Sequence, residues 1–190
     1  DKFISNGVNA KSLIPVFPSL TFPNHYSIAT GAYSDRHRIL ANSFFSKTLD
    51  KKYSMRNSES VQNGDFYGME PIWVTAEKKG LNTATYFWIG SEAEIDGYRP
   101  SIYKNYDGSV SFQSRVDSII TWFEYSDESI NLLTAVCMKG ALPISDLVFL
   151  MASIASEEPC SQPNLSPVAI VLLKVPIRNT PSPLFIEYIS

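Results

Sequence analysis

The amino-acid sequence predicts an α/β fold with a largely parallel sheet, and three observations lead to this prediction. Thr83–Trp88 is rich in β-branched and aromatic residues, which is typical of a buried strand, and Ile130–Val136 is a further strand candidate. Ser111–Phe123 carries apolar residues at the spacing of an amphipathic helix. Strands that alternate with helices are typical of layered α/β proteins.

Glycine and proline residues indicate where the first elements of the chain begin and end. Asp1–Asn6 is interpreted as the end of a helix that stops at Gly7, and Val8–Phe17 contains a strand candidate closed by Pro18. The next helix is expected over Thr21–Gly31, because Pro23 suits a first helical turn, where an amide has no helical partner to lose.

Two further segments separate this helix from the first buried strand. The polar stretch 35–66 is expected to be an irregular loop. Pro71–Gly80 is expected to be a helix with a glycine stop.

The chain divides at about residue 136. We expect residues 1–136 to form a domain and residues 137–190 to form a divergent or irregular tail. Seven of the 12 prolines lie between residues 143 and 183, where they would interrupt regular elements at short intervals.

Composition excludes several classes of function. The formal net charge of the 190 residues is -3, and no basic face is evident, so we expect no duplex nucleic acid as a partner. The two cysteines form no CxxC pair, which argues against a thiolate zinc site. The apolar stretch Val168–Val175 is too short to span a bilayer, so we expect no membrane anchor in this chain.

Thr21 is the first candidate for chemistry. It stands on a turn that leads into a helix, where free amides and the helix dipole favour a bound phosphate. Its hydroxyl could attack phosphorus if its proton were removed. The alternative is a capping threonine that satisfies helix amides and has no chemical role.

The segment Ile14–Gly31 resembles the nucleophile motif of the ectonucleotide pyrophosphatase/phosphodiesterases. Three more blocks follow in the order of that family, at Glu70–Ala76, Thr85–Ser91 and Gly108–Phe112, the last with Arg115. The resemblance covers residues 1 to about 134. It implies that residues 1–136 are a partial phosphodiesterase catalytic domain, with part of an alkaline-phosphatase-like three-layer α/β/α sandwich that is incomplete in this chain.

The resemblance assigns roles to five residues. It implies that Thr21 is the nucleophile and a metal ligand, and that Asn42 donates a hydrogen bond to a phosphate oxygen. Phe22, Met55 and Tyr106 match positions that line a nucleotide pocket, with Tyr106 stacking on the base. The alternatives from local sequence are a turn residue for Asn42 and ordinary core residues for Phe22 and Met55.

The family's metal site is expected to be mostly missing from this chain. The resemblance implies two zinc ions held by three aspartates and three histidines besides the threonine, yet the chain has two histidines. His25 lies inside the nucleophile helix and His37 in the following loop, where a structural role is expected for each. The pattern is lost after about Thr134, which suggests a truncated product, an alternative exon, an altered frame or a divergent C-terminal domain.

Three functions stay open at this point. The first is a hydrolase of phosphodiester or pyrophosphate bonds in nucleotides or related small molecules, with little or no activity expected from this incomplete chain. The second is a non-catalytic binding or interaction protein that keeps the pocket. The third is a phosphomonoester or phosphonate hydrolase of the same superfamily. The resemblance also implies an extracellular or cell-surface location.

Overall fold

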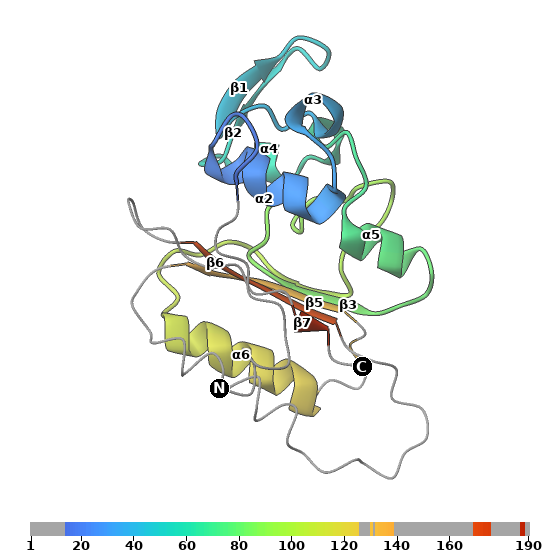
Figure 1. The fold of residues 1–190 in the computed structure, drawn as a ribbon, viewed down its shortest axis with the longest axis vertical. Helices are drawn as coiled ribbons and strands as arrows, with labels where there is room; N and C mark the ends of the chain where they lie inside the picture. Colours follow the sequence, from blue (N-terminus) through green and yellow to red (C-terminus); the bar gives the residue numbers. More distant parts are fainter. Residues whose placement is uncertain (1–13, 126–129, 131, 139–168, 176–186, 189–190) are drawn as a thin grey trace.

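The computed structural model describes residues 14–125, 130, 132–138, 169–175 and 187–188. Within these residues a mixed sheet separates two layers of helices (Figure 1). The sheet order is β4-β3-β5-β6-β7, formed by Ile102–Lys104, Thr83–Tyr86, Leu132–Met138, Ala169–Val175 and Glu187–Tyr188. The first four of these strands run parallel to one another, and β7 pairs antiparallel with β6.

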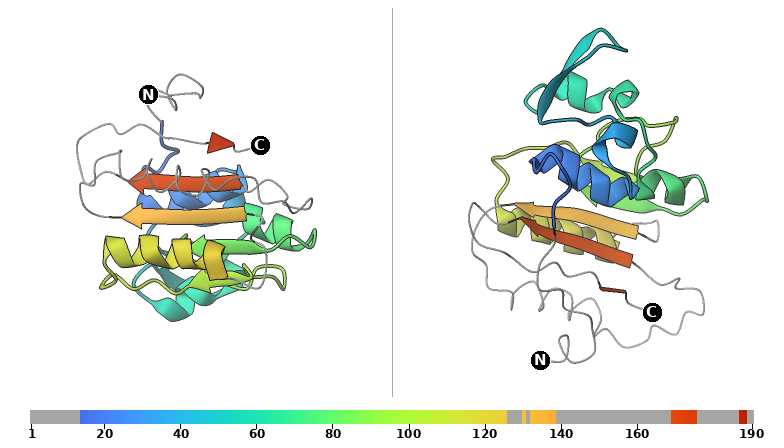
Figure 2. Two further views of the ribbon diagram at one scale, coloured as in Figure 1. Left: turned by 90° about the horizontal axis from the view of Figure 1, so that it is seen from below. Right: turned by 45° about the horizontal axis from the view of Figure 1, so that its top comes forward.

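Helix α6, Phe112–Tyr125, covers one face of the sheet, whereas α2, Thr21–Thr30, and α5, Ile72–Glu77, lie on the opposite face (Figures 1 and 2). Ala84 and Leu133, which are paired across β3 and β5, pack with Ile119 of α6. Such burial on both faces is typical of parallel strands. The predicted α/β class with a parallel sheet is therefore confirmed.

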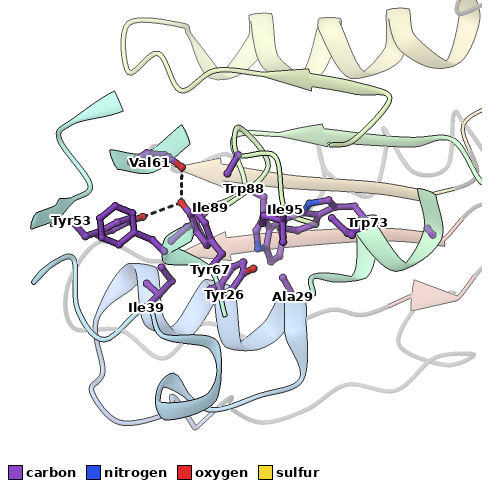
Figure 3. Close-up of a cluster of buried hydrophobic side chains, with 14 of the residues drawn as sticks. Tyr26, Ala29, Ile39, Tyr53, Val61, Tyr67, Trp73, Trp88, Ile89 and Ile95 are labelled. Atoms are coloured by element: carbon purple, nitrogen blue, oxygen red, sulfur yellow. Dashed lines mark hydrogen bonds between the residues drawn. The ribbon is translucent and has the colours of Figure 1, made fainter. Parts of the chain in front are cut away.

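The larger part of the core lies on the side of α2. It is a cluster of mostly aromatic and aliphatic side chains from α2, the following segments and the sheet (Figure 3). Within it the Tyr67 hydroxyl donates to the carbonyl of Val61 at 2.7 Å and lies 3.1 Å from the Tyr53 hydroxyl. Because buried hydroxyls need partners, this pairing allows two tyrosines to enter the core.

The segment 35–66 is more ordered than the polar sequence suggests, so the prediction of an irregular loop was wrong. It contains most of α3, Ser34–His37, then the hairpin strands β1, Ser43–Ser46, and β2, Lys51–Ser54, followed by α4, Ser58–Gln62, and the short 3₁₀ helix η1, Gly64–Phe66. Phe44 of β1 stacks on Tyr53 of β2 with ring centroids 5.0 Å apart. Cross-strand aromatic pairs of this kind stabilise short strands.

The remaining predictions of local structure have mixed outcomes. The helices predicted over Thr21–Gly31, Pro71–Gly80 and Ser111–Phe123 are confirmed as α2, α5 and α6. The predicted strand ending at Phe17 is not seen in its described part, residues 14–17, and the predicted helix end over residues 1–6 lies outside the described residues. No described helix has the length and apolar character needed to cross a membrane.

The proposed division at residue 136 falls inside β5. Residues 169–175 of the expected tail form β6, which pairs with β5 along its whole length. Most of the tail lies outside the described residues, so the domain boundary stays a prediction.

Candidate active site around Thr21

Thr21 is the first residue of α2, and the N-cap position is taken by Leu20. No side chain caps this helix by hydrogen bonding from the N-cap position. The structure therefore does not support the alternative in which Thr21 is the capping residue. Its side chain is half-buried, and its hydroxyl makes no hydrogen bond within the described part of the chain.

The loop before Thr21 is held by Asn24. Its Oδ1 accepts a 2.7 Å hydrogen bond from the amide of Val16, and its Nδ2 donates to the carbonyls of Pro18 at 3.1 Å and Leu20 at 2.8 Å. One side-chain amide thus links three backbone positions of the loop that leads to Thr21. Sequence reasoning missed this role, although an asparagine in the first helical turn after two prolines is a usable signal.

Asn42 reaches the start of α2 from the segment before β1. The amide of Phe22 donates a 2.9 Å hydrogen bond to Oδ1 of Asn42, so the side chain of Asn42 satisfies a first-turn amide from a distance. The same bond orients the side-chain amide, since Oδ1 is used by Phe22 and Nδ2 remains to donate elsewhere.

The first turn of α2 offers fewer phosphate donors than the sequence suggested. Pro23 has no amide hydrogen, the Phe22 amide is bound to Asn42, and the Asn24 amide donates to Leu20 within the helix. Among the described residues, the amide of Thr21 is the first-turn donor left without a partner. A phosphate at this helix end would therefore meet one backbone amide and the Nδ2 of Asn42.

Two of the predicted pocket residues, Phe22 and Met55, lie near Thr21 and Asn42. Met55 is tied to Asn42 because its amide donates to the Asn42 carbonyl at 2.9 Å, and its side chain is 40% exposed. Phe22 is partly buried against the core, with its ring 6.3 Å from that of Tyr53 in an edge contact. Met55 is therefore not a core residue, whereas Phe22 packs on the core.

Tyr106 stands apart from the other four predicted residues, on the loop between β4 and α6. Its side chain is 58% exposed, and its ring lies 5.2 Å from that of Phe87. The guanidinium carbon of Arg115 lies 4.9 Å from the centroid of the Phe87 ring. In the described part of the chain, no hydrogen bond or ring contact joins Tyr106 to Thr21 or Asn42.

Ser60, in α4 close to Asn57 and Ser54, is buried. Its hydroxyl accepts a hydrogen bond from the amide of Ser54 and donates to the carbonyl of the same residue, each at 3.0 Å. Because this hydroxyl is engaged with the backbone, Ser60 has a structural role at the start of α4.

Both histidines are buried and act within the fold. His25 Nδ1 is 2.7 Å from the carbonyl of Thr21, so that nitrogen carries the proton. Burial lowers the pKa of His25, and the backbone bond only partly opposes this shift. His37 accepts from the amide of Ile39 through Nδ1, so its Nε2 donates to the hydroxyl of Ser27 at 2.9 Å. Burial also lowers the pKa of His37.

The described residues do not fit the two-zinc site that the resemblance implies. Within them no group of three or more His, Cys, Asp or Glu side chains is placed to hold a metal ion. Thr21 is the one member of the implied ligand set that they contain, since the resemblance gives neither His25 nor His37 a ligand role.

Comparisons with known proteins identify the family of the chain. Residues 1–140 match the sequence profile of the family described as type I phosphodiesterase / nucleotide pyrophosphatase. Human ectonucleotide pyrophosphatase/phosphodiesterase family member 1 is 43% identical over 118 residues, which are 62% of this chain and 13% of the relative. Venom phosphodiesterase CdcPDE of Crotalus durissus collilineatus is 42% identical over 124 residues, 65% of this chain and 15% of the relative.

Solved structures give the same result at the level of the fold. Murine ectonucleotide pyrophosphatase/phosphodiesterase 5 superposes with a TM-score of 0.62 and 35% identity, covering 67% of this chain and 34% of that chain. An inactive threonine-to-alanine variant of the same murine protein, in complex with AMP, superposes with a TM-score of 0.62 and 34% identity. The chain thus spans a small part of the curated relatives and a third of the solved ones. From its profile match and these relatives, the chain belongs to the type I phosphodiesterase/nucleotide pyrophosphatase family.

Proposed function

We propose that this chain carries the nucleophile half of a hydrolase that cleaves phosphodiester or pyrophosphate bonds in nucleotides or related small molecules. The observation that carries the proposal is the hydrogen bond from the Phe22 amide to Oδ1 of Asn42. It brings the side chain of Asn42 to the first turn of α2, the helix that begins at Thr21, and we propose that the Nδ2 of Asn42 donates to the phosphate there. Donors placed where charge develops on a phosphate oxygen stabilise the transition state.

In the proposed reaction the Thr21 oxygen attacks phosphorus, and the bond from phosphorus to the leaving alcohol or phosphate breaks. The threonine proton leaves with the departing group, and a phosphoryl or nucleotidyl ester forms on Thr21. Water then cleaves that ester and restores the hydroxyl. Asn42 Nδ2 and the Thr21 amide would bind the non-bridging oxygens in both steps.

Zinc belongs to this proposal only as a group that the family resemblance implies. When bound, it would polarise the phosphate and favour the deprotonated threonine. Thr21 is the one implied zinc ligand among the described residues, and the other ligands would have to lie outside them.

The substrate class is proposed from Phe22, Met55 and Tyr106. The murine relative in complex with AMP supports a nucleotide as the bound group. The exposed ring of Tyr106 is free to stack on a base. The venom relatives support a site of action outside the cell or at its surface.

The test is a chimera in which the 118-residue matching region of human family member 1 is replaced by that of this chain. Hydrolysis of a nucleoside monophosphate aryl ester is compared with that of a simple aryl phosphodiester. We expect the chimera to cleave both, Thr21→Ala to cleave neither, and Thr21→Ser to keep part of the activity. A chimera that binds AMP but hydrolyses neither ester would favour a non-catalytic binding protein instead.

A further inference from the structure

Tyr106 is held from its backbone by a buried carboxylate. Glu92, in the loop after β3, has 8% of its surface exposed. Its Oε1 accepts a 2.8 Å hydrogen bond from the amide of Tyr106, fourteen residues further along the chain. A hydrogen bond to a charged acceptor is stronger than a neutral one, so this contact constrains the loop that carries Tyr106.

The second oxygen of the same carboxylate contacts α4. Glu92 Oε2 accepts from Nε2 of Gln62 in α4 at 3.3 Å. Burial raises the pKa of Tyr53, the hydrogen bond with Tyr67 lowers it, and the negative charge of Glu92 raises it further. Tyr53 in turn contacts the ring of Phe22. The carboxylate therefore stands between the core that supports Phe22 and the loop that carries Tyr106.

The ring of Tyr106 has a support of its own. It makes an edge contact with the ring of Phe87, a residue whose φ of 59° is in the left-handed region. Few bulky residues adopt this backbone, and it persists only where the surroundings impose it. Phe87 is covered by the guanidinium of Arg115. The ring support orients the Tyr106 side chain, whereas the Glu92 bond places its backbone.

We propose that Glu92 is a positioning residue that holds Tyr106 in place for stacking on a nucleobase, by accepting the hydrogen bond of the Tyr106 amide. This inference rests on the proposed function, because Tyr106 is assigned to the base there. It adds that the affinity for the base depends on a carboxylate that need not touch it. To hold Tyr106, residue 92 needs a hydrogen-bond acceptor at the end of a side chain as long as that of glutamate.

The experiment measures binding of adenosine to the 190-residue chain, because adenosine has no phosphate and needs no metal ion. Titration is followed by ligand-observed NMR for the unaltered chain, Tyr106→Ala, Glu92→Met and Glu92→Gln. Met has a similar length but no acceptor, and Gln keeps the acceptor. Glu94→Met is the matched control, since Glu94 is exposed and lies two residues further along the same loop.

Tyr106→Ala and Glu92→Met are each expected to weaken adenosine binding by about tenfold or more, as loss of a stacking platform does. Glu92→Gln should restore the affinity to within about threefold, since its Oε1 can still accept the bond. Glu94→Met should bind as the unaltered chain does. Hydrogen exchange at the Tyr106 amide should be slowed in the unaltered chain and in Glu92→Gln, but not in Glu92→Met.

Adenosine binding that depends on Tyr106 but is unchanged in Glu92→Met would overturn this inference alone. Absence of adenosine binding by the unaltered chain would overturn both this inference and the proposed nucleotide pocket. If Glu92→Met does not fold, the unaltered chain decides the matter. A Tyr106 amide that exchanges there as fast as a solvent-exposed amide would overturn the inference.

Discussion

The amide of Phe22 and Oδ1 of Asn42 are 2.9 Å apart, and this hydrogen bond joins the start of α2 to the segment before β1. It satisfies a helix amide and, in the same contact, leaves the Asn42 Nδ2 to donate. Two different functions of one side chain can therefore be separated by substitution.

Asn42→Asp is expected to keep the bond to Phe22 while losing the donor. In the chimera kcat should fall by about 100- to 1000-fold, the usual effect of removing one oxyanion donor. The thermal midpoint should not fall, because a carboxylate at a helix N-terminus is favourable. Asn42→Ala should lower kcat similarly and also lower the free energy of unfolding by about 1 kcal/mol. Equal activity of Asn42→Asp and the unaltered chimera would show that the Nδ2 is not used.

Tyr106→Ala is expected to discriminate between substrates. Stacking on a base contributes on the order of 1–3 kcal/mol, so KM for the nucleoside monophosphate aryl ester should rise by about 5- to 150-fold. The simple aryl phosphodiester, which has no base, should be hydrolysed as before. Equal losses for both esters would assign Tyr106 to the fold and not to the nucleotide.

The stability of the chain is expected to fall as the pH decreases below about 6.5, the ordinary value of a histidine. Burial lowers the pKa of both His25 and His37 in the folded state. Between the folded and the unfolded pKa only the unfolded chain takes up these protons, so acid favours unfolding. Each histidine can contribute up to about 1.4 kcal/mol per pH unit in this window.

Urea unfolding at about pH 7.5 and about pH 5 measures this loss. His37→Gln, whose side-chain amide can still donate to Ser27, should show a smaller loss of stability between the two pH values than the unaltered chain. An unchanged pH dependence in His37→Gln would contradict the assignment of His37 as a buried neutral group.

Glu77 is expected to be important for the sheet. Its Oε1 accepts from the amide and hydroxyl of Thr83 at 2.9 and 2.8 Å, and from the same two groups of Ser101 at 2.8 Å each. It therefore joins the starts of β3 and β4 to the end of α5. Glu77→Ala should lower the free energy of unfolding by about 2–3 kcal/mol, because donors lose a charged acceptor. The exposed Glu94→Ala is the control, and an equal small loss in both variants would refute this role.

The sequence predicted the elements whose residue types indicate burial. β3 is rich in β-branched and aromatic residues and has all four residues buried, and α6 has Ile119 buried with Val116 and Ile120 half-buried at helical spacing. β4 was not predicted, since its three residues are at most half-buried. β1 and β2 were missed because the stacking of Phe44 on Tyr53 across the hairpin is a tertiary contact.

The candidate site could be predicted only in part for the same reason. Local sequence suggests a phosphate near Thr21, and the family resemblance adds Asn42. The bond between Phe22 and Asn42 spans 20 residues, and that between Glu92 and Tyr106 spans 14. No periodicity or spacing rule specifies such contacts, because they depend on how loops pack after the sheet and α2 are formed.

Thr21 is proposed to be the nucleophile, and trapping a covalent intermediate on its hydroxyl would identify the attacking atom. The chimera is mixed with a nucleoside triphosphate, quenched in acid during the first turnover, digested and analysed by mass spectrometry. We expect a nucleotidyl group on Thr21, a serine ester in Thr21→Ser and no adduct in Thr21→Ala. An adduct on another residue, or full hydrolysis by Thr21→Ala, would rule out Thr21 as the nucleophile.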